Sequence, residues 1–162
     1  MAVDSTVCRI RRPNDEIQRA YYHGKKAFHC QKWEGAVRFS DGLICWISNK
    51  ARGPLDDLNL YRLAGLKNML IEGEKVLGDK GYVGDDTLIA PRKGANLTEE
   101  DLEINRRITQ YRIDIEHVFG KIKKFDCLQQ IWRHSLEQQN VAFQVCSQIT
   151  NIKIKMRIND DY

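Results

Sequence analysis

Residues 75–79 read KVLGD, a short apolar run that ends in an aspartate. The segment before it, residues 56–66 (DDLNLYRLAGL), has two acids at its start and leucines at helical spacing, so it predicts a helix that leads into a strand. Residues 86–91 (DTLIAP) predict a further short strand. Because open α/β sheets carry their chemistry at the carboxyl ends of their strands, Asp79 is the first candidate for a functional residue.

The N-terminal half of the chain also reads as strands. Residues 27–33 (AFHCQKW) and 43–48 (LICWIS) are apolar or aromatic runs separated by Gly35 and the turn signal SDG, which predicts a hairpin. Residues 1–4 (MAVD) form a short strand-like stub, and we expect Asp4 to lie at the end of a first strand that is incomplete. Together these elements predict an α/β fold with a mixed central sheet flanked by helices.

The C-terminal half reads as helical. Thr98, with Asp101 three residues later, resembles a capping box and predicts a long helix over residues 99–124. A second amphipathic helix is predicted over residues 136–152. The apolar stripe of the long helix is expected to consist of Leu102, Ile108, Ile115, Phe119 and Ile122, and that of the second helix of Val141, Val145, Ile149 and Ile152.

Length and charge set outer limits. With 162 residues and 42% hydrophobic content, the chain fits one domain over residues 1–162. Its 26 lysines and arginines against 22 acids give a net charge of +4, which permits a polyanionic partner without requiring one. The basic residues occur in clusters that suit a phosphate backbone, although ordinary solvated surface is the more common explanation of any one such cluster. These clusters are Arg9, Arg11 and Arg12; Lys25 and Lys26; and Lys121, Lys123 and Lys124.

The cysteines and the apolar runs exclude several classes of protein. Five cysteines without a close pair indicate neither a zinc site nor a disulfide framework, so a reducing compartment is expected. The N-terminus lacks the apolar segment of a signal peptide, and no run approaches the length that spans a bilayer. We therefore expect a soluble, intracellular protein that does not contact membranes.

Three carboxylates are the best candidates for chemistry: Asp4, Asp79 and Glu116. Steps of four and seven residues return to nearly the same face of a helix, so Arg112, Glu116 and Lys123 share one side of the long helix. Carboxylate oxygens on rigid elements, surrounded by positive charge, suit a pair of hard divalent cations and a phosphate-bearing substrate. Asn105 falls on the same stripe of the helix.

Each of these carboxylates also has a structural interpretation. Arg112 and Glu116 form an ordinary surface pair at helical spacing in this alternative, worth about 0.3 to 0.5 kcal/mol. Asp79 would then cap a turn that continues with Lys80 and Gly81, and Asp4 would be a residue of the chain end. The joint pattern favours the catalytic interpretation.

Several motifs, taken in order and spacing, resemble the nuclease domain of the PIF/Harbinger-type transposases, which are DDE superfamily endonucleases. The resemblance spans nearly the whole chain, and its Arg-x3-Glu-x6-Lys helix also resembles the Y-R-E-K signature of bacterial insertion-sequence transposases. Thr109 stands where that signature has its tyrosine, with Tyr111 nearby. The motifs are DST at residues 4–6, RP at 12–13 through YYHGKK at 21–26, Gly53 with Asp57, DKGY at 79–82, and Asn105 with Arg112, Glu116, Phe119, Gly120 and Lys123.

The resemblance implies a ribonuclease-H-like fold and a single DDE-type nuclease domain. It makes Asp4, Asp79 and Glu116 a catalytic triad that binds two Mg²⁺ or Mn²⁺ ions and cleaves phosphodiester bonds in DNA, and it extends to strand transfer. Arg112, Lys123 and Asn105 would hold phosphates or orient the acids, and Asp57 would be an accessory residue. The implied partners are DNA, a separate DNA-binding protein and further copies of the chain, and the implied location is the nucleus in preference to the cytoplasm.

The chain departs from the family pattern in three places. Asp56 stands before Asp57, where members of the family commonly carry histidine, and it could alter the local charge. The helix-turn-helix region that finds DNA ends is absent, and the first strand is short. A second hypothesis is therefore a domesticated or decayed copy that serves as a non-catalytic DNA-binding or protein-interaction module.

Overall fold

The structure is a computed structural model that describes residues 1–14 and 17–160, with side chains up to residue 157. Its strands form a mixed sheet in the order β2-β3-β1-β6-β7, and β4 and β5 also pair with β3. The predicted α/β fold with a mixed central sheet is thereby confirmed. The strands are β1 (Ala2–Arg9), β2 (Tyr22–His23), β3 (Phe28–Val37), β4 (Ile44–Ile47), β5 (Ala51–Arg52), β6 (Val76–Leu77) and β7 (Leu88–Ile89).

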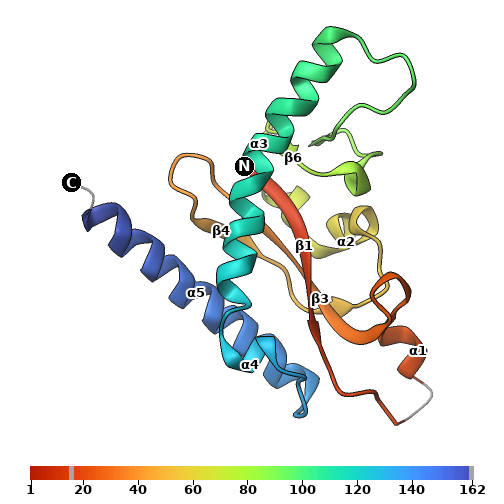
Figure 1. Cartoon of the computed structure of the whole chain (residues 1–162), viewed down its shortest axis with the longest axis vertical. Coiled ribbons are helices and arrows are strands. Elements are labelled where there is room, and N and C mark those ends of the chain that lie inside the picture. The colour runs from red at the N-terminus through yellow and green to blue at the C-terminus, as the bar shows by residue number, and fades with distance from the viewer. Residues whose placement is uncertain (15–16, 161–162) are drawn as a thin grey trace.

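Helices cover both faces of the sheet (Figure 1). On one face, Ile115 of α3 and Phe143 of α5 pack with Trp33 in the larger core cluster. On the other face, Tyr61 of α2 packs against Val3 and Ala36. The helices are α1 (Gln18–Tyr21), α2 (Asp57–Ala64), α3 (Glu99–Ile122), α4 (Asp126–Gln129) and α5 (Leu136–Asp160), with short 3-10 helices η1 (Gly24–Lys26), η2 (Leu66–Met69) and η3 (Lys80–Tyr82).

The first strand is longer than the sequence predicted. β1 extends to Arg9 and lies in the middle of the sheet, antiparallel to β3 and parallel to β6. Asp4 therefore lies inside a central strand of eight residues, and the expectation that the strand ends at Asp4 is wrong. The reason is that β1 is covered on both faces, so its sequence shows no clear alternation of apolar and polar residues. The predicted hairpin is confirmed, because β4 pairs antiparallel with β3.

The long helix is confirmed over residues 99–122. The hydroxyl of Thr98 accepts a hydrogen bond from the backbone N–H of Asp101, and the Asp101 carboxylate accepts one from the N–H of Thr98, which completes the predicted capping box. Four of the five predicted apolar positions are buried. Leu102 is the exception and is 55% exposed, because the first turns of α3 extend beyond the sheet (Figure 1).

The second amphipathic helix presents a different face from the one predicted. α5 continues to Asp160, and all four residues of the predicted stripe, Val141 through Ile152, are exposed. The buried face consists instead of Phe143, Cys146, Thr150 and Ile154 together with polar residues. This face is hard to see in the sequence, because the buried hydroxyls of Ser147 and Thr150 donate to backbone carbonyls of the same helix and so need no other partner.

All five cysteines are free thiols. Cys127 and Cys146 lie nearest to each other, with their Sγ atoms 3.8 Å apart. Within the residues that the structure describes, every helix is too short or too polar to cross a bilayer.

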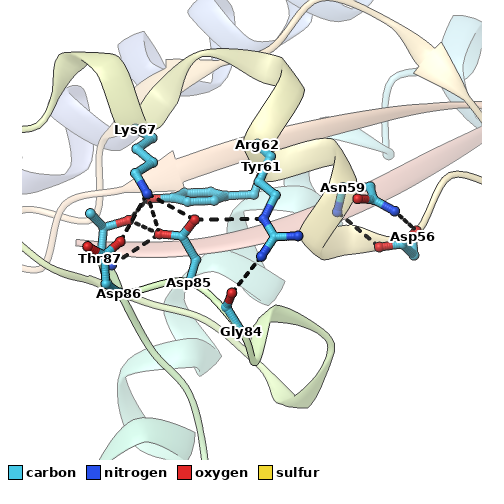
Figure 2. A network of polar contacts seen from close by, with 9 residues as sticks. All are labelled: Asp56, Asn59, Tyr61, Arg62, Lys67, Gly84, Asp85, Asp86 and Thr87. Atoms are coloured by element: carbon cyan, nitrogen blue, oxygen red, sulfur yellow. Dashed lines mark hydrogen bonds and ion pairs between the residues drawn. The ribbon is translucent and has the colours of Figure 1, made fainter.

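A network of ion pairs joins α2 and η2 to the loop that enters β7 (Figure 2). The Nζ atom of Lys67 lies 2.9 Å from a carboxylate oxygen of Asp85 and 2.9 Å from one of Asp86. Asp85 also accepts hydrogen bonds from the N–H and hydroxyl of Thr87, and the same hydroxyl contacts Tyr61. These bonds hold the pKa of the Asp85 carboxyl below its usual range.

We expect Asp85→Asn to lower the free energy of unfolding by about 1.5 kcal/mol, because the Asp85 side chain is only 6% exposed and its charge has several partners. Asp86→Asn is the matched control, since it removes a charge from the same lysine at a side chain that is 87% exposed. Urea denaturation of both variants measures the difference. Equal losses would show that the network contributes nothing beyond surface charge.

Candidate catalytic site

Asp4 projects from β1 toward α3. It faces the same side of the sheet as its partner across the strands, Gly35, whose Cα lies close under Phe119 of α3. One carboxylate oxygen of Asp4 accepts a hydrogen bond of 2.7 Å from the backbone N–H of Ser5. Burial raises the pKa of the Asp4 carboxyl to about 6, against the lowering effects of this hydrogen bond and of Arg112. A buried carboxylate of this kind favours a cation as its partner.

Asp79 follows β6 and comes to the same place as Asp4. β6 is the parallel neighbour of β1, with Leu77 opposite Ala2, so the residues just beyond β6 lie beside the start of β1. The Asp79 carboxylate caps η3 by accepting a hydrogen bond of 2.6 Å from the N–H of Gly81. The capping role expected in the structural interpretation is therefore present, and it fixes the orientation of the carboxylate.

One guanidinium contacts all three predicted acids. The Nη2 atom of Arg112 lies 3.6 Å from Asp4, 4.0 Å from Asp79 and 3.2 Å from Glu116. The pair of Arg112 and Glu116 at helical spacing does exist, but Arg112 is not a surface side chain: it is only 19% exposed, and its charge is shared with two acids of the sheet. Glu116 is 58% exposed, so it forms the open side of this cluster.

Asp57 joins the cluster from the other face of the sheet. It accepts hydrogen bonds of 2.5 Å from the hydroxyl of Ser5 and 2.9 Å from Nζ of Lys32. A β-carbon placed on Gly81 would lie 2.9 Å from a carboxylate oxygen of Asp57 and 2.9 Å from one of Asp79, so these two acids flank this glycine. Asp57 is thus bonded directly to Ser5, the residue that follows Asp4.

The site is therefore a set of four carboxylates and two cations gathered at one edge of β1. Residues 3–151 match the profile of the family described as DDE superfamily endonuclease, which is most of the chain. The chain belongs to the DDE superfamily endonucleases. It is also 27% identical, over 97% of its length, to a protein described as a probable transposase for insertion sequence element IS702 from Microchaete diplosiphon.

This DDE chain spans about 58% of the length of that curated relative. No solved structure matches this chain.

Lys32 and Ser5 belong to the candidate site, and the sequence analysis did not identify either as a contributor. Lys32 is 5% exposed and also donates to the backbone carbonyl of Leu55, which ties the start of α2 to β3. A lysine inside an otherwise apolar strand was the available signal, because a buried ammonium group requires a charged partner. Its partner, Asp57, is 25 residues away in the chain and was not evident.

Asp56 does not add its charge to the acid cluster. It is the N-cap of α2, and its carboxylate accepts hydrogen bonds from the N–H and the side-chain amide of Asn59 (Figure 2). These bonds lower the pKa of the Asp56 carboxyl. The departure from the family's histidine at this position is therefore explained by a helix cap.

Asn105 and Lys123 lie on the face of α3 that carries Glu116. Neither residue forms a hydrogen bond or ion pair with Asp4, Asp79 or Glu116 in the described part of the chain. The amide of Asn105 makes two hydrogen bonds with the backbone of Arg92, of 2.8 and 3.1 Å, and so holds the preceding loop against α3. Lys123 is the C-cap of α3, about 10 Å beyond Glu116 along the helix axis.

The donor set fits a hard divalent cation in its chemistry. Asp4, Asp79 and Glu116 supply carboxylate oxygens, which Mg²⁺ and Mn²⁺ prefer, and they already surround one positive charge. Among the described residues, no three acids, histidines or cysteines are grouped closely enough to hold an ion as they stand. Arg112 would have to turn away from the acids for these residues to coordinate metal.

Proposed function

We propose that this chain is the catalytic domain of a transposase-like DNA endonuclease that cleaves phosphodiester bonds with the help of divalent metal. The observation that carries the proposal is the convergence of Asp4, Asp79 and Glu116 on the guanidinium of Arg112. Three separate elements, β1, the end of β6 and α3, bring these groups together, and a surface ion pair alone would not require this. Membership of the DDE superfamily supports the same assignment.

The chain's own residues would have distinct roles. Asp4, Asp79 and Glu116 would hold two Mg²⁺ or Mn²⁺ ions, which supply an activated water and stabilise the leaving 3′-oxygen. Arg112 neutralises the acids before metal arrives and is free to hold a substrate phosphate afterwards. Lys32 and Ser5 donate hydrogen bonds to Asp57. These bonds hold α2 against the strand that carries Asp4. Lys123 would hold a phosphate further along the DNA.

The fold would be ribonuclease-H-like, and the subtype would be the PIF/Harbinger type. The domain would act on DNA ends as a homo-oligomer, together with a separate DNA-binding protein, and would transfer strands as well as cut them. Its location would follow its substrate, and a nuclear location stays a prediction.

A non-catalytic function is the second candidate, because Arg112 already neutralises the acid cluster. An arginine that stays in place would make the cluster a structural ion-pair network, as expected for a decayed copy that only binds DNA or protein. The two candidates differ in whether the acids are needed for cleavage.

The deciding experiment measures nicking of supercoiled plasmid in Mg²⁺ or Mn²⁺. We expect Asp79→Asn and Glu116→Gln to lower the rate by on the order of a hundredfold or more, because each removes charge from the reacting centre. Asp114→Asn is the matched control, since Asp114 is an exposed acid two residues from Glu116 on the same helix. Equal rates from the wild type and both site variants would remove these acids from the mechanism.

A further inference from the structure

A basic cavity lies between the C-terminal end of α3 and the C-terminal half of α5, away from the acids. Its volume is about 240 Å³. Four cationic side chains surround a floor formed by Phe125 and Ile154. The cations are Lys121 and Lys124 from the end of α3 and Lys153 and Arg157 from α5.

The cations of this basic cavity are not neutralised by ion pairs with other described side chains. Every ion pair found within 4.0 Å in the described part of the chain involves other lysines and arginines. Residues 117–157 carry seven lysines and arginines against two acids, a net charge of +5 in a chain whose total is +4. Like charges held together in this way attract an anion.

Helix dipoles explain only part of this arrangement. The negative end of α3 favours Lys121 and Lys124 by about 0.3 to 1 kcal/mol each. Lys153 lies about two turns before the end of α5, so no helix terminus accounts for its position. Instead, its Nζ atom stands 5.0 Å from the centre of the Phe125 ring, which holds the charge over the cavity floor.

The cavity connects with the candidate catalytic site around the outside of α3. At 100° per residue, the C-cap Lys123 points to nearly the same side as Glu116, and Lys121 lies about 140° further round the helix. Lys124 follows in the turn after α3 and lines the cavity with Lys121. The three lysines therefore form a basic path from the acid cluster to the cavity. A polyanion bound at Glu116 could follow this path across the helix.

We propose that this basic cavity binds a backbone phosphate of the DNA on which the chain acts, so that the duplex is gripped on both sides of α3. The inference rests on the proposed function for the identity of the polymer. The mixed lining suits a phosphodiester, because the cations contact phosphate oxygens while Phe125 and Ile154 contact the sugar. The cavity adds affinity and does not take part in the chemistry.

The test is DNA binding by fluorescence anisotropy in EDTA, with a short labelled duplex and a series of salt concentrations. We expect Lys121→Gln/Lys153→Gln to weaken binding about tenfold and to reduce the slope of log affinity against log salt by about one to two. Lys155→Gln is the control: it removes one charge, half of the charge that the double variant removes, from an exposed position of α5 outside the cavity. Circular dichroism checks that all variants fold.

Plasmid nicking separates this inference from the proposed function. We expect the double variant to reach the wild-type rate at saturating DNA and to need about tenfold more DNA to do so. Wild-type binding by the double variant, or an equal loss in Lys155→Gln, would overturn the cavity assignment whether or not the chain cuts DNA. Loss of affinity in a protein that does not nick would instead retain the cavity and reject the nuclease.

Discussion

Replacing Glu34 by glutamine is expected to stabilise the metal-free protein at high pH. The difference in the free energy of unfolding between the variant and the wild type is expected to be roughly 4 kcal/mol larger at about pH 9 than in acidic solution. Glu34 lies on β3 opposite Ser5 and is 0% exposed. Burial raises the pKa of its carboxyl to about 8. The nearby acids Asp57 and Asp4 raise it further, while the Tyr82 hydroxyl and Lys32 oppose the shift.

The direction of the pH dependence follows from the raised pKa of Glu34. A carboxyl group is protonated below its ordinary pKa of 4.5 in both the folded and the unfolded chain, so it costs no stability there. As the pH rises, the unfolded chain releases its proton first, and the folded protein loses stability until the pH passes about 8. About 2 kcal/mol of this loss is expected between about pH 6.5 and pH 9.

Urea denaturation at several pH values measures this effect as the difference between Glu34→Gln and the wild type. Glu72→Gln is the control, because it makes the same substitution at an exposed turn. Neither carboxylate oxygen of Glu34 nor the Tyr82 hydroxyl has a hydrogen-bond partner of normal geometry among the described residues. A difference that stayed constant from neutral to alkaline pH would mean that Glu34 is paired or hydrated when ionised.

Replacing Arg112 by glutamine is expected to destabilise the metal-free protein by about 2 to 3 kcal/mol at neutral pH. The substitution removes the one cation that Asp4, Asp79 and Glu116 share. Because Glu116 is exposed, the free energy of unfolding falls by less than it would for a fully buried ion pair. Without Arg112 the pKa of the Asp4 carboxyl would rise above its present value of about 6, so the variant would take up protons near neutral pH.

Saturating Mg²⁺ or Mn²⁺ is expected to restore most of the stability that Arg112→Gln loses, because an ion that binds only the folded state raises the free energy of unfolding. Arg106→Gln is the matched control: Arg106 is on the same helix, pairs with Glu103 and is 70% exposed. Its loss should be below about 0.5 kcal/mol and independent of metal. If metal left Arg112→Gln as unstable as before, the acids would be a structural cluster and not a cation site.

Much of the candidate site was accessible from local sequence patterns. The run before Asp79 predicted a strand end, and β6 brings that residue to the edge where the acids meet. The spacing of Arg112 and Glu116 predicted a shared helix face, and both contribute to the cluster. These features depend on contacts within a few residues, for which the period of a helix or strand is a direct guide.

Other parts of the site depend on contacts that no local pattern contains. Ser5 bonds Asp57 across 52 residues, and Arg112 meets Asp4 across more than a hundred. The interior position of Asp4 in β1 was missed because helices cover both faces of that strand. The exposed apolar stripe of α5 was predicted to be buried. The face that is buried was missed because its polar side chains satisfy their hydrogen bonds within the helix.

The amino-acid sequence by itself determined the class of elements, the cap of α3, the charge of the chain and the three acids worth testing. Only the tertiary structure decided that one arginine holds those acids together, that Lys32 and Ser5 support them, and that basic residues of α3 and α5 enclose a cavity. The physical reason is that periodicity reports which face of an element is apolar, whereas partners across the sheet are chosen by the packing of the whole chain.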